Sequence, residues 1–231
     1  MMSFFDIKNI FFQISFIERT YFFSYIEFFG TIFGFLCIWF ASRAKRINYV
    51  FGIINVLLFS IIFIQIELYA SFFLQIFFLI TNIYGWFIWK KKDYLNKHLK
   101  ISHIGLFNLI KLISISLILV CFLMLNIDVI LHYFFLFFLK INNLFHLNIF
   151  LKKVEMNYFL FLDSIITVLS MLAMILMIKK YVENWLLWII INLLSIFIFY
   201  LKEVYFILIE YIFLLIISIY GFLNWRKKLK Y

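Results

Sequence analysis

The sequence predicts an all-α integral membrane protein, with seven transmembrane helices arranged as two parallel three-helix repeats joined by one further span. Three observations predict this fold: the composition, seven apolar stretches of spanning length, and an internal repeat. Of the 231 residues, 67% are hydrophobic and only 14% are charged, whereas a soluble domain is nearer half apolar and a quarter charged. A water-facing surface needs more polar residues than this, so soluble globular and disordered classes are excluded.

The apolar stretches set the number of spans, because a helix needs about 20 mainly apolar residues to cross a bilayer. The run from Phe4 to Ile17 is interrupted by Asp6, Lys8 and Gln13, so it predicts an interfacial helix and not a span. Residues 126–157 predict a long, partly interfacial connection. Spanning helices are predicted at residues 23–41, 49–66, 70–89, 103–125, 158–178, 184–201 and 204–225.

The net charge of +10 is explained by membrane topology and does not indicate a nucleic-acid partner. When successive loops are assigned to opposite sides of the membrane, one side holds 14 Lys and Arg residues and the other holds 6. The positive-inside rule then places the N-terminus outside and the C-terminus in the cytoplasm. Trp89 and Trp225 each precede a basic run, which is typical of interfacial anchors.

An internal repeat appears when the sequence is shifted by 136 residues. Residues 20–92 and 156–228 then share 22 identities in 73 aligned pairs. Each copy contains three spans and the fourth span reverses the direction between them, so the copies are predicted to lie parallel, as in one group of transporter folds. The predicted parts are an interfacial segment (1–22), a first repeat (23–92), a linker with the fourth span (93–157), and a second repeat with a basic tail (158–231).

Polar side chains within the spans are candidates for a substrate path, because they are costly in hydrocarbon and usually face a bundle interior. Glu27 and Asp163 begin equivalent helices, where an acid can either stabilise the helix N-terminus or contact a ligand. Glu210 lies deeper and its repeat counterpart is Leu74, which favours a specific role. The remaining candidates are Asn55, Tyr69, Gln75, Asn82, Asn192 and Tyr205. For Asn55, a hydrogen bond that only joins two helices is an equal alternative.

The sixth span carries Trp185, Trp188 and Asn192 at spacings of three and four, which place them on one helical face. Two indoles and an amide could stack a flat ring and hydrogen-bond its polar edge, and a cationic ring would gain about 0.5–2 kcal/mol from the indoles. A plain interfacial belt of Trp is the alternative. Among the spans only the fourth contains a cation away from its ends, Lys111. An unphosphorylated, neutral or cationic aromatic cargo is therefore favoured over a nucleotide.

No catalytic group, metal site or cofactor is predicted. The four His residues are scattered through loops and span ends, and Cys37 and Cys121 lie singly in apolar stretches. A membrane enzyme and a non-transporting scaffold are the alternatives from other classes. Both leave the repeat and the one-faced Trp/Asn pattern unexplained.

Several short patterns recur together in this chain: Leu68-Tyr69-Ala70, Leu74-Gln75, Tyr84-Gly85-Trp86 with Trp89, Asp163-Ser164 with Thr167, the Trp185–Trp188–Asn192 run, Lys202 with Tyr205, and Tyr220-Gly221 with Trp225. Through these residues, and over residues 20–228, the chain resembles the PnuC-type vitamin transporters. The resemblance implies a fold related to the SWEET sugar transporters, assembled as a homotrimer in the bacterial inner membrane. It implies facilitated diffusion of nicotinamide riboside, which a cytoplasmic kinase then traps. It also implies a pocket lined by Trp185, Trp188, Asn192 and Gln75.

The chain also departs from this family. A Trp-Asn-Trp-Pro stretch is common before the family's second span, and here the stretch is Ile47-Asn48-Tyr49-Val50. A Tyr common after the family's Gln is Phe77 or Phe78 here. Relatives in the family carry thiamine or riboflavin, so these two vitamins are the alternative cargoes.

Overall fold

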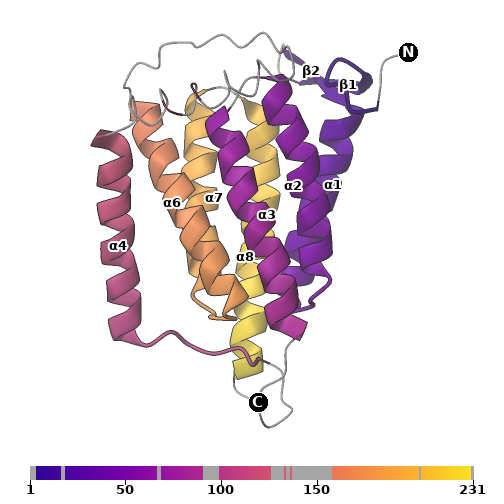
Figure 1. The fold of residues 1–231 in the computed structure, drawn as a ribbon. Helices are drawn as coiled ribbons and strands as arrows, with labels where there is room; N and C mark the ends of the chain where they lie inside the picture. Colours follow the sequence, from indigo (N-terminus) through magenta and orange to yellow (C-terminus); the bar gives the residue numbers. More distant parts are fainter. Residues whose placement is uncertain are drawn as a thin grey trace.

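A computed structural model describes residues 4–16, 19–66, 69–90, 99–125, 133, 136, 158–202 and 204–229. Within these residues a bundle of seven helices carries one β-hairpin at its upper end in Figure 1. The region 126–157, predicted to be a partly interfacial connection, lies almost wholly outside the described residues. The elements are β1 (Ile10–Phe16), β2 (Arg19–Ser24), α1 (Tyr25–Ser42), α2 (Asn48–Gln65), α3 (Tyr69–Lys90), α4 (Leu106–Leu125), α6 (Tyr158–Ile178), α7 (Asn184–Leu201) and α8 (Tyr205–Leu229).

The helices form a closed ring with one helix outside it. Contacts run from α1 to α2, α3, α6, α7 and α8 in turn, and α8 returns to α1. Helix α4 packs against α6 at the edge of the bundle (Figure 1). Helices α1 and α6 both begin at the upper end, where the N-terminus lies, and α3 and α8 both end at the lower end with the C-terminus. The interior of the ring is therefore shared by the two halves of the chain.

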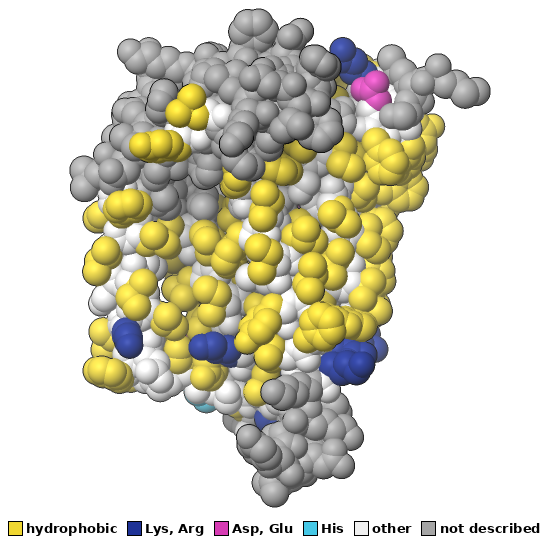
Figure 2. All heavy atoms as spheres, viewed as in Figure 1, with side chains coloured by type: hydrophobic (Ala, Val, Ile, Leu, Met, Phe, Trp, Pro, Cys, Tyr) yellow, Lys and Arg dark blue, Asp and Glu magenta, His cyan; other side chains and the backbone are white. Residues whose placement is uncertain are grey.

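The molecule is built to cross a membrane several times. Five of the helices, α1, α2, α3, α7 and α8, are long and apolar enough to span. Helices α4 and α6 have 20 and 21 residues, about 30 Å of helix, and run alongside the others (Figure 1). All seven predicted spans are confirmed as helices, with ends within four residues of those predicted. In Figure 2 hydrophobic side chains cover the flank of the bundle and cations gather near its lower end.

The predicted interfacial helix near the N-terminus is wrong. Ile10–Phe16 is a strand that pairs antiparallel with Arg19–Ser24. The rings of Phe12 and Phe23 stack across the hairpin at 5.0 Å, and the Ser15 and Thr20 hydroxyls are hydrogen-bonded at 3.2 Å. A short apolar run rich in Ile and Phe fits a strand as well as a helix, and here the cross-strand pairs decide the outcome.

The 136-residue offset of the sequence recurs in the structure. At the lower end, the α1–α2 turn and the α6–α7 turn each contain one residue with positive φ, Ala44 (57°) and Lys180 (55°). Asn48 and Asn184 begin the next helices, and each donates through Nδ2 to the carbonyl three residues earlier, at 2.7 and 2.6 Å. Residues 136 positions apart therefore adopt the same local structure at these turns.

The following aromatic residues repeat the same packing. Tyr49 meets the ring of Trp89 edge-on at 5.0 Å, and Trp185 meets Trp225 in the same way at 5.7 Å. In each pair a glycine lies against one ring: Gly85 lies against Tyr49, and Gly221 lies against Trp185. These close approaches need the absence of a Cβ, which explains the Tyr-Gly pair in both halves of the sequence.

The two halves are joined by a reciprocal pair of hydrogen bonds. Trp89 Nε1 donates to the carbonyl oxygen of Ile178 at 3.0 Å, and Trp225 Nε1 donates to that of Ala41 at 3.0 Å. Each bond links the last helix of one half to the end of the first helix of the other. Around these bonds, buried side chains from all six ring helices form one hydrophobic cluster, the lower cluster: Ala41, Tyr49, Trp89, Met174, Met177, Ile178, Val182, Trp185 and Trp225.

We expect Gly221→Ala to destabilise the protein by about 1–3 kcal/mol through overpacking. The new Cβ would lie 2.7 Å from three atoms of the Trp185 indole, which is only 1% exposed and has no room to move. Thermal unfolding of the purified protein in detergent measures the effect. Gly105→Ala is the control, because a Cβ there meets nothing within 4 Å. Equal melting temperatures for the two variants would contradict this packing.

We expect Trp225→Phe to cost about 1–3 kcal/mol, because it leaves the buried Ala41 carbonyl without the indole donor. Tyr84→Phe is the control, since Tyr84 is 58% exposed. The same unfolding assay applies. A loss for Trp225→Phe no larger than that for Tyr84→Phe would show that the bond between the two halves is not stabilising.

Candidate functional site

The inner face of α7 carries the predicted Trp and Asn residues at two depths. Trp185 and Asn192 are both buried, 1% and 3% exposed, while Trp188 is half-buried. Seven residues of helix separate Trp185 from Asn192, about 10 Å along the axis. The three side chains therefore do not form one flat surface on which a ring could stack. Trp188 lies between the other two along the helix, and it alone is partly exposed.

Trp185 is part of the lower cluster. Its ring lies between Gly221 and Trp225, and its Nε1 has no hydrogen-bond partner among the described residues. Trp188 packs on the outside of the same cluster. In this conformation Trp185 serves as a packing residue, and Trp188 is the indole at the boundary between the cluster and the ring interior above it.

Asn192 links α7 to α8 through a short relay of hydrogen bonds. Its Nδ2 donates to Ser218 Oγ at 3.0 Å, and Ser218 Oγ donates to the carbonyl of Leu214 at 2.8 Å. Ser218 is 2% exposed. The relay fixes the amide of Asn192 at about the middle of α7, the depth at which parallel-repeat transporters hold their cargo.

Asn82 occupies the equivalent place in the first half, because Ser218 is its repeat counterpart. It is 4% exposed, and its Nδ2 donates to the Phe78 carbonyl at 2.8 Å. Its Oδ1 faces Gly52 and has no partner among the described residues. A buried acceptor without a donor costs about 1–3 kcal/mol, so this amide is a strained point in the packing of α3 against α2.

Asn55 and Glu27 are used within the protein. Asn55 Nδ2 donates to the Gly30 carbonyl at 2.8 Å and so joins α2 to α1, which is the alternative left open by the sequence. Glu27 forms a capping box with Ser24 at the start of α1. Its Oε2 accepts bonds from Ser24 N at 2.9 Å and from Ser24 Oγ at 2.7 Å.

The other predicted residues lie toward the upper end. Asp163 is exposed near the start of α6, while Gln75, Tyr205 and Glu210 are half-buried on α3 and α8. Tyr69 begins α3, but its side chain lies outside the described residues. A hollow of about 470 Å³ at the upper end is lined by Phe5, Asp6, Ile7, Lys8 and Gln65, outside this set of residues.

Tyr49 is a residue of the site region that the sequence analysis missed. It is fully buried in the lower cluster, and its hydroxyl has no partner among the described residues. The signal was present, because Tyr49 is the repeat counterpart of Trp185. Pairing every candidate with its counterpart would have identified it, and would have paired Trp188 with Gly52.

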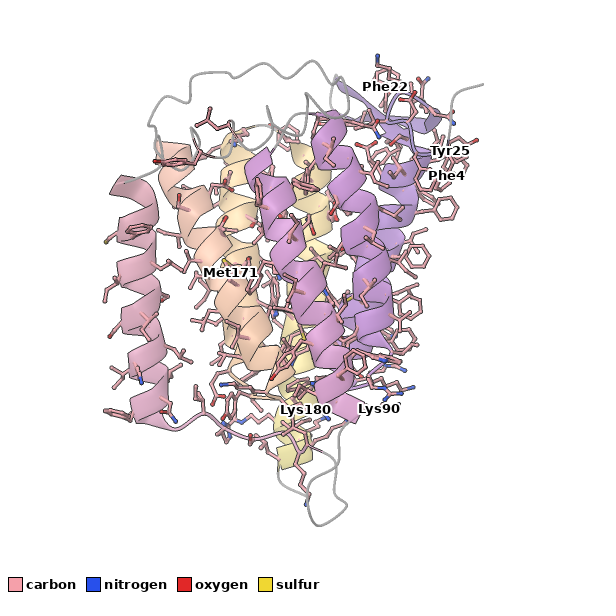
Figure 3. The ribbon with its side chains drawn as sticks, viewed as in Figure 1. Phe4, Phe22, Tyr25, Lys90, Met171 and Lys180 are labelled. Atoms are coloured by element: carbon pink, nitrogen blue, oxygen red, sulfur yellow. The ribbon has the colours of Figure 1, made fainter. Side chains whose placement is uncertain are left out.

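The described part of the chain offers chemistry for binding a polar aromatic molecule. No three His, Cys, Asp or Glu side chains lie close enough there to hold a metal ion. The described cations of the ring helices lie at helix ends, such as Lys90 (Figure 3). Lys111 is exposed on α4, outside the ring. The ring interior thus presents indoles and amides, without a described cation that would pair with a phosphate.

Comparison with known proteins gives consistent results. The nicotinamide riboside transporter PnuC of Escherichia coli K12 is 41% identical over 225 residues, covering 97% of this chain and 94% of that protein. The PnuC of Neisseria mucosa is 26% identical over 208 residues, covering 85% and 70%.

One solved structure, described as the crystal structure of the vitamin B3 transporter PnuC, has the same fold. It matches with a TM-score of 0.63 at 24% identity, covering 90% of this chain and 83% of that one. A sequence family described as nicotinamide mononucleotide transporter matches residues 24–227. This chain, a multi-pass membrane protein, therefore belongs to the nicotinamide mononucleotide transporter family.

Proposed function

We propose that the protein takes up nicotinamide riboside across the bacterial inner membrane by facilitated diffusion. The observation that carries this proposal is the 41% identity to the Escherichia coli nicotinamide riboside transporter over nearly the whole of both chains. At this identity and coverage, nearly every residue of this chain aligns with a residue of that transporter. The closed ring of six helices lined by indoles and amides is consistent with this cargo.

The mechanism is alternating access between two three-helix units, residues 23–92 and 158–231, in a 3+1+3 arrangement related to SWEET transporters. The matching turns and aromatic pairs 136 residues apart support two equivalent units, and α4 lies outside the ring, packed against α6. Rocking of the units about the interior would expose the cargo to each side in turn.

The lower cluster is the gate on the cytoplasmic side. Its members come from all six ring helices, so it fills the ring interior at the basic end. The positive-inside rule makes this end cytoplasmic and places the N-terminal hairpin outside. The structure is thus closed toward the cytoplasm, and the Trp89 and Trp225 bonds must break or shift before cargo can leave.

The cargo is held above this gate. Trp188 stacks on the pyridinium ring, the amide groups of Asn192 and Asn82 bond its carboxamide or ribose, and Gln75 approaches from above. A pyridinium over an indole gains about 0.5–2 kcal/mol. Tyr205, Asp163 and Glu210 line the outer approach, where carboxylates favour a cation.

Nicotinamide riboside is favoured over its phosphorylated form by the electrostatics of the path. A phosphate in a low-dielectric interior needs paired cations, and the described ring helices have theirs only at their ends. Facilitated diffusion cannot accumulate cargo by itself, so uptake depends on a cytoplasmic kinase. The phosphate that the kinase adds blocks return through the same path. We also propose that the assembly is a homotrimer.

We expect Trp188→Ala to lower the affinity for nicotinamide riboside by at least tenfold, because it removes the stacking surface while leaving the lower cluster closed. Isothermal titration of purified protein measures this. Phe107→Ala is the control, since Phe107 is 80% exposed on α4. Wild-type affinity in Trp188→Ala would remove this residue from the site.

In proteoliposomes we expect uptake of nicotinamide riboside to exceed that of nicotinamide mononucleotide and of thiamine by at least tenfold. Nicotinamide mononucleotide is disfavoured because the described ring helices carry cations only at their ends. Thiamine is disfavoured because the chain is 41% identical to a nicotinamide riboside transporter. Uptake should not change when a pH gradient is imposed. Preference for thiamine would reassign the cargo, and acceleration by a pH gradient would replace facilitated diffusion with proton coupling.

A further inference from the structure

The turn between α1 and α2 concentrates positive charge at the lower end of the bundle. Arg43, Lys45 and Arg46 fall within four residues, and Arg43 and Lys45 are exposed. Lys228, at the end of α8, reaches the same place because its Nζ donates to the Arg43 carbonyl at 2.7 Å. Figure 2 shows dark-blue atoms gathered at the lower right, below α1 and α2. We call these four residues the turn cations.

Each cation of the turn is held over an aromatic ring. The guanidinium carbon of Arg43 lies 4.3 Å from the centre of Trp39, and that of Arg46 lies 4.1 Å from the centre of Trp86. The Lys45 ammonium lies 5.9 Å from the ring of Phe40. Stacking on a ring orients a cation without neutralising it, so the N–H groups at the guanidinium edges stay free for an anion.

The equivalent turn in the second half shows the contrast. There the segment 99–105 lies against the α6–α7 turn, through Ser102 N to the Lys180 carbonyl and Val182 N to the Ser102 carbonyl. Lys180 Nζ donates to the Leu99 carbonyl at 2.9 Å, and burial together with the nearby Lys228 ammonium lowers the pKa of Lys180. The carboxylate of this second turn, Glu183, is hydrogen-bonded to His103 at 2.9 Å.

Three of the turn cations, Arg43, Lys45 and Arg46, have no described partner that neutralises their charge, and the fourth, Lys228, bonds the Arg43 carbonyl. Among the described residues no carboxylate is hydrogen-bonded or ion-paired with Arg43, Lys45 or Arg46. The two equivalent turns thus differ: the segment 99–105 and the Glu183 carboxylate lie at the second, whereas the first presents three ring-stacked cations without a described carboxylate partner.

The neighbouring surface faces lipid at the depth of the headgroups. One turn of helix above Arg43, Trp39 stacks on Tyr220 of α8 at 5.6 Å and 18°, and the two rings are 37% and 41% exposed. Exposed Trp and Tyr mark the boundary between headgroups and acyl chains. A molecule that places an anionic group at the turn cations and a hydrocarbon chain against Trp39 and Tyr220 would fit this surface. A phospholipid has both parts.

We propose that the turn cations and the Trp39–Tyr220 pair form a binding site for an anionic phospholipid of the cytoplasmic leaflet. The guanidinium groups of Arg43 and Arg46 bond the phosphate, Lys45 and Lys228 add attraction, and the acyl chains lie along the stacked rings. Because the site joins the ends of α1 and α8, which belong to different halves, a bound lipid stabilises the lower end in its closed conformation.

The test is lipid retention measured by native mass spectrometry on the full-length protein with phosphatidylglycerol or phosphatidylcholine. We expect the wild type to retain phosphatidylglycerol preferentially, and Arg43→Gln/Arg46→Gln to lower its apparent affinity by about thirtyfold, as expected for losing two cations near the surface. Lys179→Gln/Arg226→Gln is the matched control, since it removes two exposed cations at the same end. Equal losses in both double variants, or no lipid preference in the wild type, would overturn the proposal.

Two further measurements keep the test decisive if the double variant does not fold. Brominated phosphatidylglycerol should quench wild-type tryptophan fluorescence more than brominated phosphatidylcholine does, and Trp39→Phe should remove most of that difference. Equal quenching by the two lipids would refute the site. An excess of inorganic phosphate should leave the lipid bound, and displacement by phosphate would identify a free-anion site instead.

Discussion

Two indole N–H groups hold the two halves of this molecule together. A donor buried among apolar side chains is costly without an acceptor, and the carbonyls at the end of a helix have no partner within that helix. Trp89 meets both needs at Ile178, and Trp225 meets them at Ala41. Each half therefore supplies the acceptor for an indole of the other half.

The same bonds close one end of the molecule. Because the crossed bonds and the lower cluster lie at the basic end, that end is filled by side chains from every ring helix. Above it lie polar groups, such as the Asn192–Ser218 hydrogen bond and the Asn82 Oδ1, which has no described partner. A closed end below a more polar interior is the contrast that the proposed transport mechanism needs.

The equivalent positions of the two halves are filled differently where function differs. Tyr49 and Trp185 are both packing rings with a glycine against them, whereas Gly52 and Trp188 are counterparts with opposite bulk. The glycine makes room for the Asn82 amide, and the indole presents a stacking surface. A symmetric frame thus holds an asymmetric interior, which suits a cargo that is aromatic at one end and a sugar at the other.

The sequence by itself determined the seven helices, their approximate ends and the 136-residue repeat, because spanning length and apolar composition are local properties. It also supplied candidate residues for the interior, since polar side chains in spans are few. The strand pairing of Ile10–Phe16, the capping role of Glu27 and the helix-joining role of Asn55 depended on partners distant along the chain or on backbone geometry. Only the tertiary structure could separate Trp185 from Trp188, because one helical face runs from the packed lower cluster to the half-buried position above it.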